Sequence, residues 1–274
     1  MRLAQPKTEI PRNPATTALM HSNHNSIIKH VANSILRPKG FFQMGKSRTW
    51  LYDCGYCVVQ IEFQPSSFSR GTYCNVGTAF LFEYFGELNK TLAFDFGTRR
   101  ISSGKSEFIE YTGDDKAFEA QLFELTNNAL EYAKELIKFK SLKHGDWRMS
   151  KLLFSKWINR LFSKHNYELY DCYNAAMIKF LRGKPNSGKR LLTKLNRLNL
   201  QSPYKEWIET TYAEFCGTET TAESAKAKVR HAINARRCQT KIDQFKHRTT
   251  NSVSTPSTAT YHSATNGHLK NFHC

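Results

Sequence analysis

Two cysteines stand at a spacing used by redox and metal sites. Cys54 and Cys57 form a C-x-x-C pattern, which occurs in thiol–disulfide sites and in zinc sites. A reactive thiolate is stabilised by a helix N-terminus or a nearby cation, whereas Asp53–Gly55 is typical of a tight turn between two strands. Zinc would need two more ligands, and only Cys74 follows at a short distance. We therefore predict a buried Cys57 and an exposed Cys54 at the turn, with no metal and no cofactor.

A phosphate-binding pattern lies just before this pair. Residues 40–47, GFFQMGKS, fit G-x-x-x-x-G-K-[ST]. A phosphate-binding loop must follow a strand and open a helix, because the helix N-terminus and exposed N–H groups hold the phosphates. Here a predicted helix precedes the pattern and a predicted strand follows it, so we expect Gly45 and Lys46 to form a turn. GKPNSGKR at residues 183–190 has similar spacing but ends in Arg190 and stands between predicted helices.

Acidic residues in predicted strands could hold Mg²⁺ for the hydrolysis of nucleic acid. Glu62 and Gln64 follow Asp53 as an E-x-Q pattern, and Asp95 in a later strand could join them, since carboxylates are suitable Mg²⁺ ligands. Gln64 replaces the basic residue that often completes this pattern, and acidic side chains on the wet face of an antiparallel sheet are ordinary. A Mg²⁺-dependent nuclease with Glu62 and Asp95 as catalytic residues is the weakest of three functional hypotheses.

These residues belong to a stretch in which hydrophobic side chains recur at every second position. The alternation over residues 57–63 predicts a strand with one apolar and one wet face. Further strands are predicted at residues 72–83, 91–96 and 108–111. Their connections are too short for parallel crossovers, which need a dozen or more residues. The sequence therefore predicts an antiparallel β-meander.

Two helices are expected to flank the meander. Helical spacing predicts one helix at residues 26–36, ended by Pro38 and Gly40, and a long helix from Asp114 with an apolar stripe. A sheet with one apolar face needs such a cover. The prediction is an α+β domain over residues 24–140.

The remainder of the chain divides by composition. The pattern after His144 is helical and predicts a small all-α unit over residues 146–216. Residues 1–23, rich in proline and small polar residues, are expected to be a flexible leader. Residues 217–274 predict one basic helix followed by a disordered tail.

Positive charge is concentrated in the second half of the 274-residue chain. The formal net charge is +17, yet residues 41–140 hold 11 basic against 13 acidic side chains, whereas residues 151–274 hold 21 against 8. A basic surface attracts phosphates, although Lys and Arg also solvate the exposed faces of helices. Nucleic-acid association is therefore the second hypothesis, with the candidate residues Lys189, Arg190, Lys194 and Arg197.

One stretch has a more particular sequence. R-T-W at residues 48–50, D-x-G-Y at 53–56, F-Q-P-S-S-F-S-x-G-x-Y-x-N-V-G at 63–77 and F-D-F-G at 94–97 make the chain resemble an uncharacterised bacterial domain-of-unknown-function family. The resemblance covers roughly residues 26–140 and implies a small α+β domain in a bacterial cytoplasmic protein. It implies no activity, cofactor or catalytic residue.

Strand pairing does not explain the sequence of the polar loop Pro65–Gly71. Exposed loops on a rigid scaffold commonly carry binding residues, and aromatic side chains flank this one. The first hypothesis is therefore a non-enzymatic cytoplasmic binding protein for another macromolecule. No apolar run approaches the roughly 20 residues needed to span a bilayer, so we expect no membrane partner. The candidate binding residues are Gln64, Ser66, Ser67, Phe68, Ser69, Tyr73 and Asn75.

Overall fold

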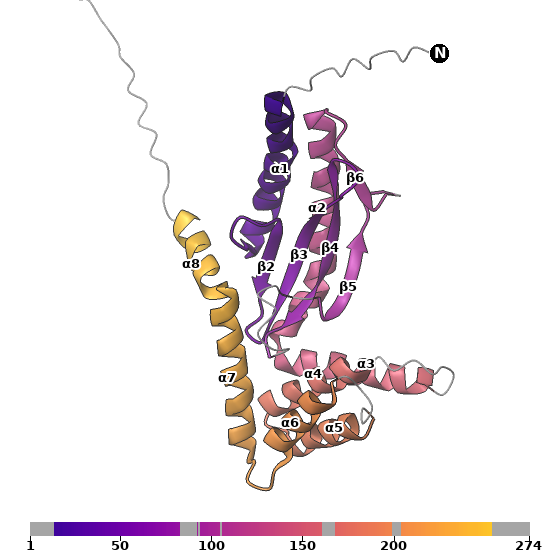
Figure 1. Ribbon diagram of the computed structural model, residues 1–274, viewed down its shortest axis with the longest axis vertical. Coiled ribbons are helices and arrows are strands. Elements are labelled where there is room, and N and C mark those ends of the chain that lie inside the picture. The colour runs from indigo at the N-terminus through magenta and orange to yellow at the C-terminus, as the bar shows by residue number, and fades with distance from the viewer. Residues whose placement is uncertain are drawn as a thin grey trace, which may run out of the picture.

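The computed structural model describes residues 14–82, 92, 94–104, 106–160, 168–198 and 204–253. In this part of the chain, a six-stranded sheet lies at one end and a group of helices at the other (Figure 1). All strand pairs are antiparallel. The predicted α+β class is confirmed.

The strands follow one another across the sheet in the order β1-β2-β3-β4-β5, and β6 pairs with the start of β4. Connections between the first four strands are short hairpins, which is the predicted meander. The strands are β1 (Phe42–Gln43), β2 (Thr49–Asp53), β3 (Cys57–Pro65), β4 (Gly71–Phe80), β5 (Phe96–Ile101) and β6 (Phe108–Glu110).

The turns between these strands depend on glycine as the sequence predicts. Gly55 has a φ of 90° between β2 and β3, a conformation that favours glycine. The Gly55 N–H donates to Asp53 Oδ1 at 2.8 Å, which fixes the turn. Gly45 has a φ of 60° in the β1–β2 turn, so GFFQMGKS connects strands and does not open a helix.

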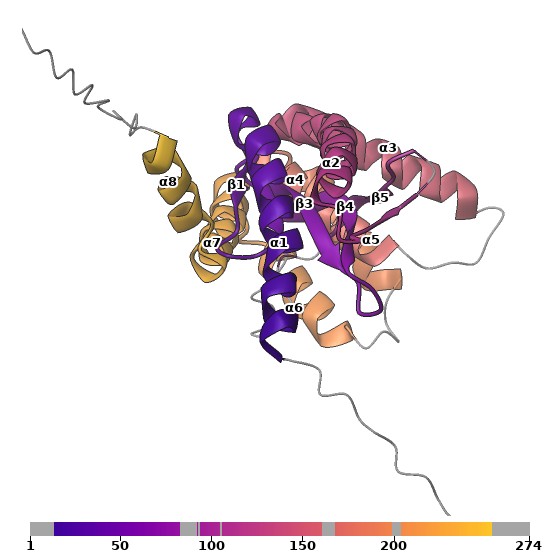
Figure 2. The ribbon, with the colours of Figure 1, turned by 90° about the horizontal axis from the view of Figure 1, so that it is seen from above.

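Two helices cover the apolar face of the sheet. α2 (Asp115–Ile137) packs on β3 and β4, and α1 (Pro14–Leu36) packs beside α2 (Figure 2). Asp114 caps α2 by accepting hydrogen bonds from the N–H groups of Lys116 and Ala117, as acidic N-cap residues do. The buried stripe of α2 includes the predicted residues Phe118, Leu122, Leu125, Ala129 and Leu136.

The second half of the chain is helical. None of the described helices has both the length and the apolar character needed to cross a bilayer. Asp146, which is buried, forms ion pairs with Lys179, Arg182 and Lys184 and so joins α3 to the end of α4. The helices are α3 (Leu142–Arg160), α4 (Glu168–Leu181), α5 (Pro185–Leu198), α6 (Lys205–Cys216), α7 (Ala222–Thr240) and α8 (Ile242–Val253), with 3₁₀ turns η1 (Arg37–Lys39) and η3 (Lys138–Lys140).

The last two helices return to the sheet. α7 packs on α4, and α8 reaches β1, where the Phe245 ring lies 3.4 Å from the position a Cβ would occupy on Gly45. In Figure 1 they run along the β2 side of the sheet. Residues 217–274 therefore contain two helices where the sequence predicts one. The predicted tail beyond residue 253 lies outside the described residues.

Several boundaries differ from the predictions. α1 begins at Pro14, so only residues 1–13 of the predicted leader lie outside the described part. The strand expected at residues 91–96 is wrong, because β5 begins at Phe96. The β5 residues Thr98–Arg100 are exposed at the sheet edge. They are polar, so β5 lacks the hydrophobic alternation by which strands are predicted from sequence.

Cys54 is buried, contrary to the prediction that it is exposed. Only 5% of its surface is accessible, and its thiol lies 3.9 Å from the Ile137 carbonyl oxygen at the end of α2. The helices packed around the turn cover a position that hairpin geometry alone would leave in solvent. Burial also raises the pKa of the Cys57 thiol, so Cys57 does not form the thiolate that redox chemistry requires.

Candidate functional site

The loop between β3 and β4 is held in one shape by its own contacts. The Phe68 N–H donates to Ser66 Oγ at 3.1 Å, which forms a local turn. Gly71, with a φ of 154°, lies so close to the Ile109 carbonyl oxygen that a Cβ would collide with it. The Phe68 side chain is 98% exposed at the tip. The loop therefore presents an aromatic ring to solvent from a defined backbone.

Behind this loop is a hollow of about 380 Å³. It lies between the loop, the His24–Asn25 segment of α1 and the residue that precedes β2, Arg48. We call it the Arg48 pocket. Its lining residues are His24, Asn25, Arg48, Pro65, Ser66, Ser67, Phe68, Ser69, Arg70 and Gly71.

Arg48 is a half-buried charged group in the lining of this pocket. Its Nη2 donates to Asn25 Oδ1 and lies 3.4 Å from His24 Nε2. Its Nη1 is buried and has no hydrogen-bond partner in the described part of the chain. Burial without a neighbouring negative charge lowers the pKa of the guanidinium. The sequence marked Arg48 only as part of the R-T-W signature.

Polar side chains continue from the loop onto the open face of the sheet. Asn75 Nδ2 donates to Gln64 Oε1 at 2.8 Å and to Glu62 Oε2 at 3.3 Å. Arg100 of β5 donates to Gln64 Oε1 and Asn75 Oδ1, both at 3.3 Å. The Arg100 guanidinium also lies 4.3 Å from the centre of the Tyr73 ring. Gln64, Tyr73 and Asn75 therefore form one polar surface, to which Arg100 adds a positive charge.

Arg100 and Arg48 lie near the loop and were not among the site residues predicted from the sequence. Arg100 was missed because β5 begins later than predicted. Arg100 lies opposite Asn75 because of the way β5 pairs with β4.

Farther along the sheet, the open face is closed by the segment before β5. The Gln60 amide donates to the Leu92 carbonyl oxygen at 3.4 Å. The Phe94 ring lies 2.6 Å from the position that a Cβ on Gly77 would occupy. The accessible part of this face is therefore the part next to the Pro65–Gly71 loop.

The candidate nuclease residues do not converge. Glu62 lies opposite Asn75 in the register of β3 and β4, while the Asp95 carboxylate accepts a hydrogen bond from the Phe80 N–H at 2.7 Å. Positions five residues apart on a strand are separated by about 17 Å. Asp53 is occupied elsewhere, in ion pairs with two cations. Within the described residues, no group of three or more His, Cys, Asp or Glu side chains could hold a metal ion.

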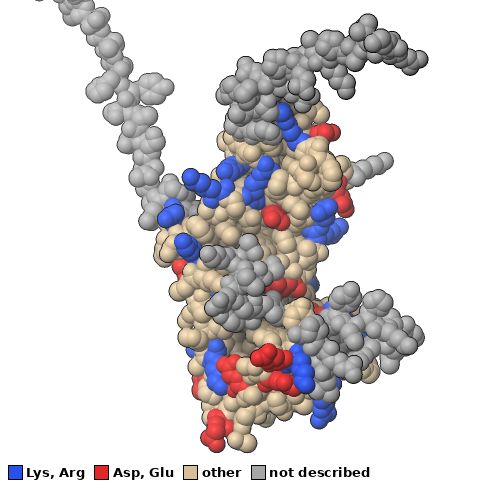
Figure 3. All heavy atoms as spheres, in the orientation of Figure 1, with Lys and Arg blue, Asp and Glu red and all other residues tan. Residues whose placement is uncertain are grey.

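The basic candidates of α5 serve different roles. Lys189 donates to the carbonyl oxygens of Gly217 and Thr220 at 3.3 Å and 3.1 Å, which fixes the α6–α7 connection. Arg190, Lys194 and Arg197 are spaced by four and three residues and therefore share a face of α5. On the face shown in Figure 3, Lys and Arg side chains are dispersed, and at its lower end they lie next to Asp and Glu side chains.

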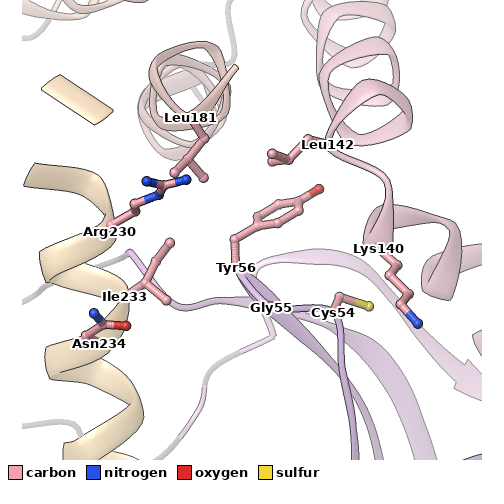
Figure 4. Close-up of a pocket in the computed structure, with 9 residues that line it drawn as sticks. All are labelled: Cys54, Gly55, Tyr56, Lys140, Leu142, Leu181, Arg230, Ile233 and Asn234. Carbon is pink, nitrogen blue, oxygen red and sulfur yellow. The ribbon is translucent and has the colours of Figure 1, made fainter. Parts of the chain in front are cut away.

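A second hollow, of about 410 Å³, lies where the β2–β3 turn meets the helices. Tyr56 points into it, and Arg230 and Asn234 of α7 form the opposite wall (Figure 4). The lining is mixed, with Leu142 and Leu181 completing an apolar side. Since burial raises the pKa of the Tyr56 phenol, this hydroxyl stays protonated and supplies no base.

Comparison with protein-family models, with curated proteins and with solved structures finds no match to this chain. The Arg48 pocket brings together an exposed aromatic ring, a half-buried cation and several hydroxyl groups.

Proposed function

We propose that this chain is a non-enzymatic binding protein that recognises another macromolecule through the Pro65–Gly71 loop and the adjoining open face of the sheet. The observation that carries the proposal is Phe68, which is 98% exposed on a loop fixed by the Ser66 turn and by Gly71. An exposed side chain of this size forgoes about 1.5–3 kcal/mol that burial would contribute. A partner that covers Phe68 would remove that cost.

The polar surface beside the loop supports the same proposal. Gln64, Asn75 and Arg100 hold one another in place through hydrogen bonds of 2.8 to 3.3 Å. Side chains that are already ordered lose little further entropy when a partner binds. An aromatic anchor surrounded by ordered polar groups is the usual composition of a protein-binding surface.

A cytoplasmic location is part of the proposal. Cys54, Cys57 and Cys74 are buried thiols, and unpaired cysteines of this kind are typical of reducing compartments. The resemblance to a bacterial domain family supports the same compartment.

The proposal predicts that Phe68→Ala weakens capture of a partner about tenfold or more, because aromatic anchors carry much of the energy of an interface. The protein would be immobilised and exposed to a lysate of the cells that make it naturally. The retained material would be compared between wild type and variant. Phe123→Ala is the matched control, since Phe123 is a 54% exposed phenylalanine on α2, away from the loop.

The fold is expected to be unchanged in both variants, which thermal unfolding would verify. A partner retained equally by wild type, Phe68→Ala and Phe123→Ala would contradict the role of the loop. Retention only of nucleic acid, with a steep salt dependence unaffected by Phe68→Ala, would favour the basic helices instead.

A further inference from the structure

Arg48 carries a charge that the described residues leave uncompensated. Its neighbours in the pocket are the Asn25 amide and the His24 ring, neither of which carries a negative charge. No carboxylate in the described part of the chain pairs with it, in contrast to Arg237 and Arg182, which each bind a buried aspartate. A partly buried guanidinium is most favourable beside a carboxylate or phosphate, whose two oxygens match its fork of N–H groups.

The loop supplies further donors around the same hollow. Ser66, Ser67 and Ser69 line it together with a second cation, Arg70. Ser66 Oγ already accepts a hydrogen bond from the Phe68 N–H, so its hydroxyl hydrogen can be donated to a ligand. No Asp or Glu is among the residues that line this pocket. The hollow therefore offers positive charge and hydroxyl donors without a competing carboxylate.

We propose that the Arg48 pocket binds an oxyanion carried by a protein partner, either a side-chain carboxylate or a phosphorylated serine or threonine. The inference rests on the proposed binding function and specifies what the partner presents. Arg48 and Arg70 neutralise the anion, the loop serines donate hydrogen bonds to it, and Phe68 packs on an apolar residue next to it.

A protein ligand is favoured over nucleic acid by what surrounds the pocket. The hollow of about 380 Å³ has room for one anionic group. Glu62 lies on the adjoining face, where it accepts from Asn75, and Glu110 pairs with Gly71 at the loop base. A phosphate backbone that continued past the pocket would run over these carboxylates and be repelled by them, whereas a single anion occupies only the pocket, whose lining holds no Asp or Glu.

The first test uses the full-length protein and inorganic phosphate, with acetate as the carboxylate probe. Backbone amide signals of residues 66–71 and the Arg48 side-chain signal are expected to shift saturably in NMR titrations. Arg48→Gln and Arg70→Gln should each weaken phosphate binding, Arg48→Gln by about tenfold or more. Arg99→Gln is the control, because it removes an exposed arginine of β5 that does not line the pocket, and it should leave the titration unchanged.

Arg48→Gln removes the hydrogen bond to Asn25 of α1, so the wild-type shift map and Arg70→Gln serve as readouts that do not depend on that contact. Shifts that localise to α5, or shifts of equal size in wild type and Arg70→Gln, would overturn the assignment. Absence of any saturable shift with both anions would also overturn it.

The second test separates the two sources of the anion. Three peptides of one sequence would place phosphoserine, glutamate or serine next to a leucine, and binding would be followed by the same amide signals. The proposal requires the phosphoserine or the glutamate peptide to bind about tenfold or more tightly than the serine peptide. Equal binding of all three would overturn it, as would tighter binding of a short single-stranded DNA.

The two proposals fail in different ways. If a partner is retained in a Phe68-dependent manner but phosphate and Arg48→Gln have no effect on it, the binding function stands and the oxyanion assignment fails. If phosphate binds at residues 66–71 while no partner depends on Phe68, the anion site stands and the macromolecular function fails.

Discussion

Helix propensity predicts that alanine at position 145 would stabilise the protein, but the hydroxyl oxygen of Tyr56 occupies the space that the alanine Cβ would need. Tyr56 is buried with its ring stacked near Phe80 and Phe82, at centroid distances of 6.4 Å and 6.3 Å. Its hydroxyl has no hydrogen-bond partner among the described residues. That hydroxyl lies against Gly145 in the first turn of α3, within the space a Cβ would need.

We predict that Gly145→Ala lowers the free energy of unfolding by up to about 2 kcal/mol. Alanine favours a helix over glycine by about 1 kcal/mol, but forcing a methyl group onto a fixed phenol costs about 1–3 kcal/mol. Tyr56→Phe should be neutral or slightly stabilising, because it removes a buried hydroxyl that lacks a partner. Urea denaturation of the two single variants and the double variant would measure these effects.

The double variant isolates the contact. In the Tyr56→Phe background the closest atom is gone and only carbons at 3.3 Å remain, so Gly145→Ala should cost much less. An equal cost in both backgrounds would place the strain elsewhere than at the hydroxyl.

At the scale of elements, Asp53 attaches α7 and α8 to the β2–β3 turn. Arg237 forms a bidentate pair with it, Nη2 to Oδ2 at 2.7 Å and Nη1 to Oδ1 at 3.0 Å. Lys246 of α8 adds Nζ to Oδ2 at 2.8 Å, and Arg237 Nη1 also donates to the Gly55 carbonyl oxygen at 3.1 Å. The side chains of Asp53 and Arg237 are only 8% and 14% exposed, so solvent screens this pair poorly.

We predict that Arg237→Ala destabilises the protein by about 3 kcal/mol, because it leaves a buried carboxylate without its main partner. Lys246→Ala is the matched control and should cost less than about 1 kcal/mol, since Lys246 is 49% exposed. Chemical denaturation at neutral pH would measure both changes. Similar losses in the two variants would contradict the dominance of the Arg237 pair.

The same cluster makes stability depend on pH. Hydrogen bonds from Arg237 and Lys246 hold the pKa of Asp53 well below its ordinary value, despite burial that would raise it. A carboxyl whose pKa is lower in the folded state stabilises above its unfolded pKa of about 3.9 and loses that contribution as pH falls through the folded value. Acid unfolding below about pH 4 should therefore be less steep in Asp53→Asn than in wild type.

How much of this could be read from sequence depends on the range of the interaction. The period of two over residues 57–63 and the glycine at position 55 predicted the hairpin, because neighbouring residues determine both. The ion pair of Asp53 with Arg237 joins residues 184 positions apart, and no local pattern marks it. For the same reason α8 was missed: its own sequence is polar, and its docking through Phe245 and Ile242 depends on the sheet.

The candidate site divides in the same way. Ser66–Ser69, including Phe68, could be predicted as binding residues because their composition is distinctive and strand pairing does not account for them. Arg48 acquires its meaning only when α1 brings Asn25 and His24 to it from 23 and 24 positions away. Burial of Cys54 is likewise a product of packing, through the end of α2.

For the whole molecule, the two predicted units share one hydrophobic core. A single cluster of buried residues extends from Ile28 in α1 to Ile242 in α8. The Tyr173 hydroxyl of α4 donates to the Phe82 carbonyl oxygen at 2.8 Å, just after β4, and joins the sheet to the helices. Gly145, expected near a boundary, lies within α3 and contacts Tyr56 of the sheet. The sheet and the helices should therefore unfold together.

This continuity predicts what removal of α7 and α8 would do. A chain ending at Gly217 loses Val229, Ile233 and Ile242, all at most 7% exposed, and uncovers the face of α4 on which α7 packs. Burial of side chains of this size contributes about 1.5–3 kcal/mol each. The loss is comparable with the 5–15 kcal/mol stability of a typical domain, so the shortened chain should unfold over a broad range and bind a hydrophobic dye. A chain ending at Val253 retains every described element and should unfold in one transition, with tryptophan fluorescence and helical circular dichroism coincident. If the chain ending at Gly217 also gave one sharp, coincident transition, the sheet and helices would not depend on α7 and α8, and the shared core would not explain the stability of this molecule.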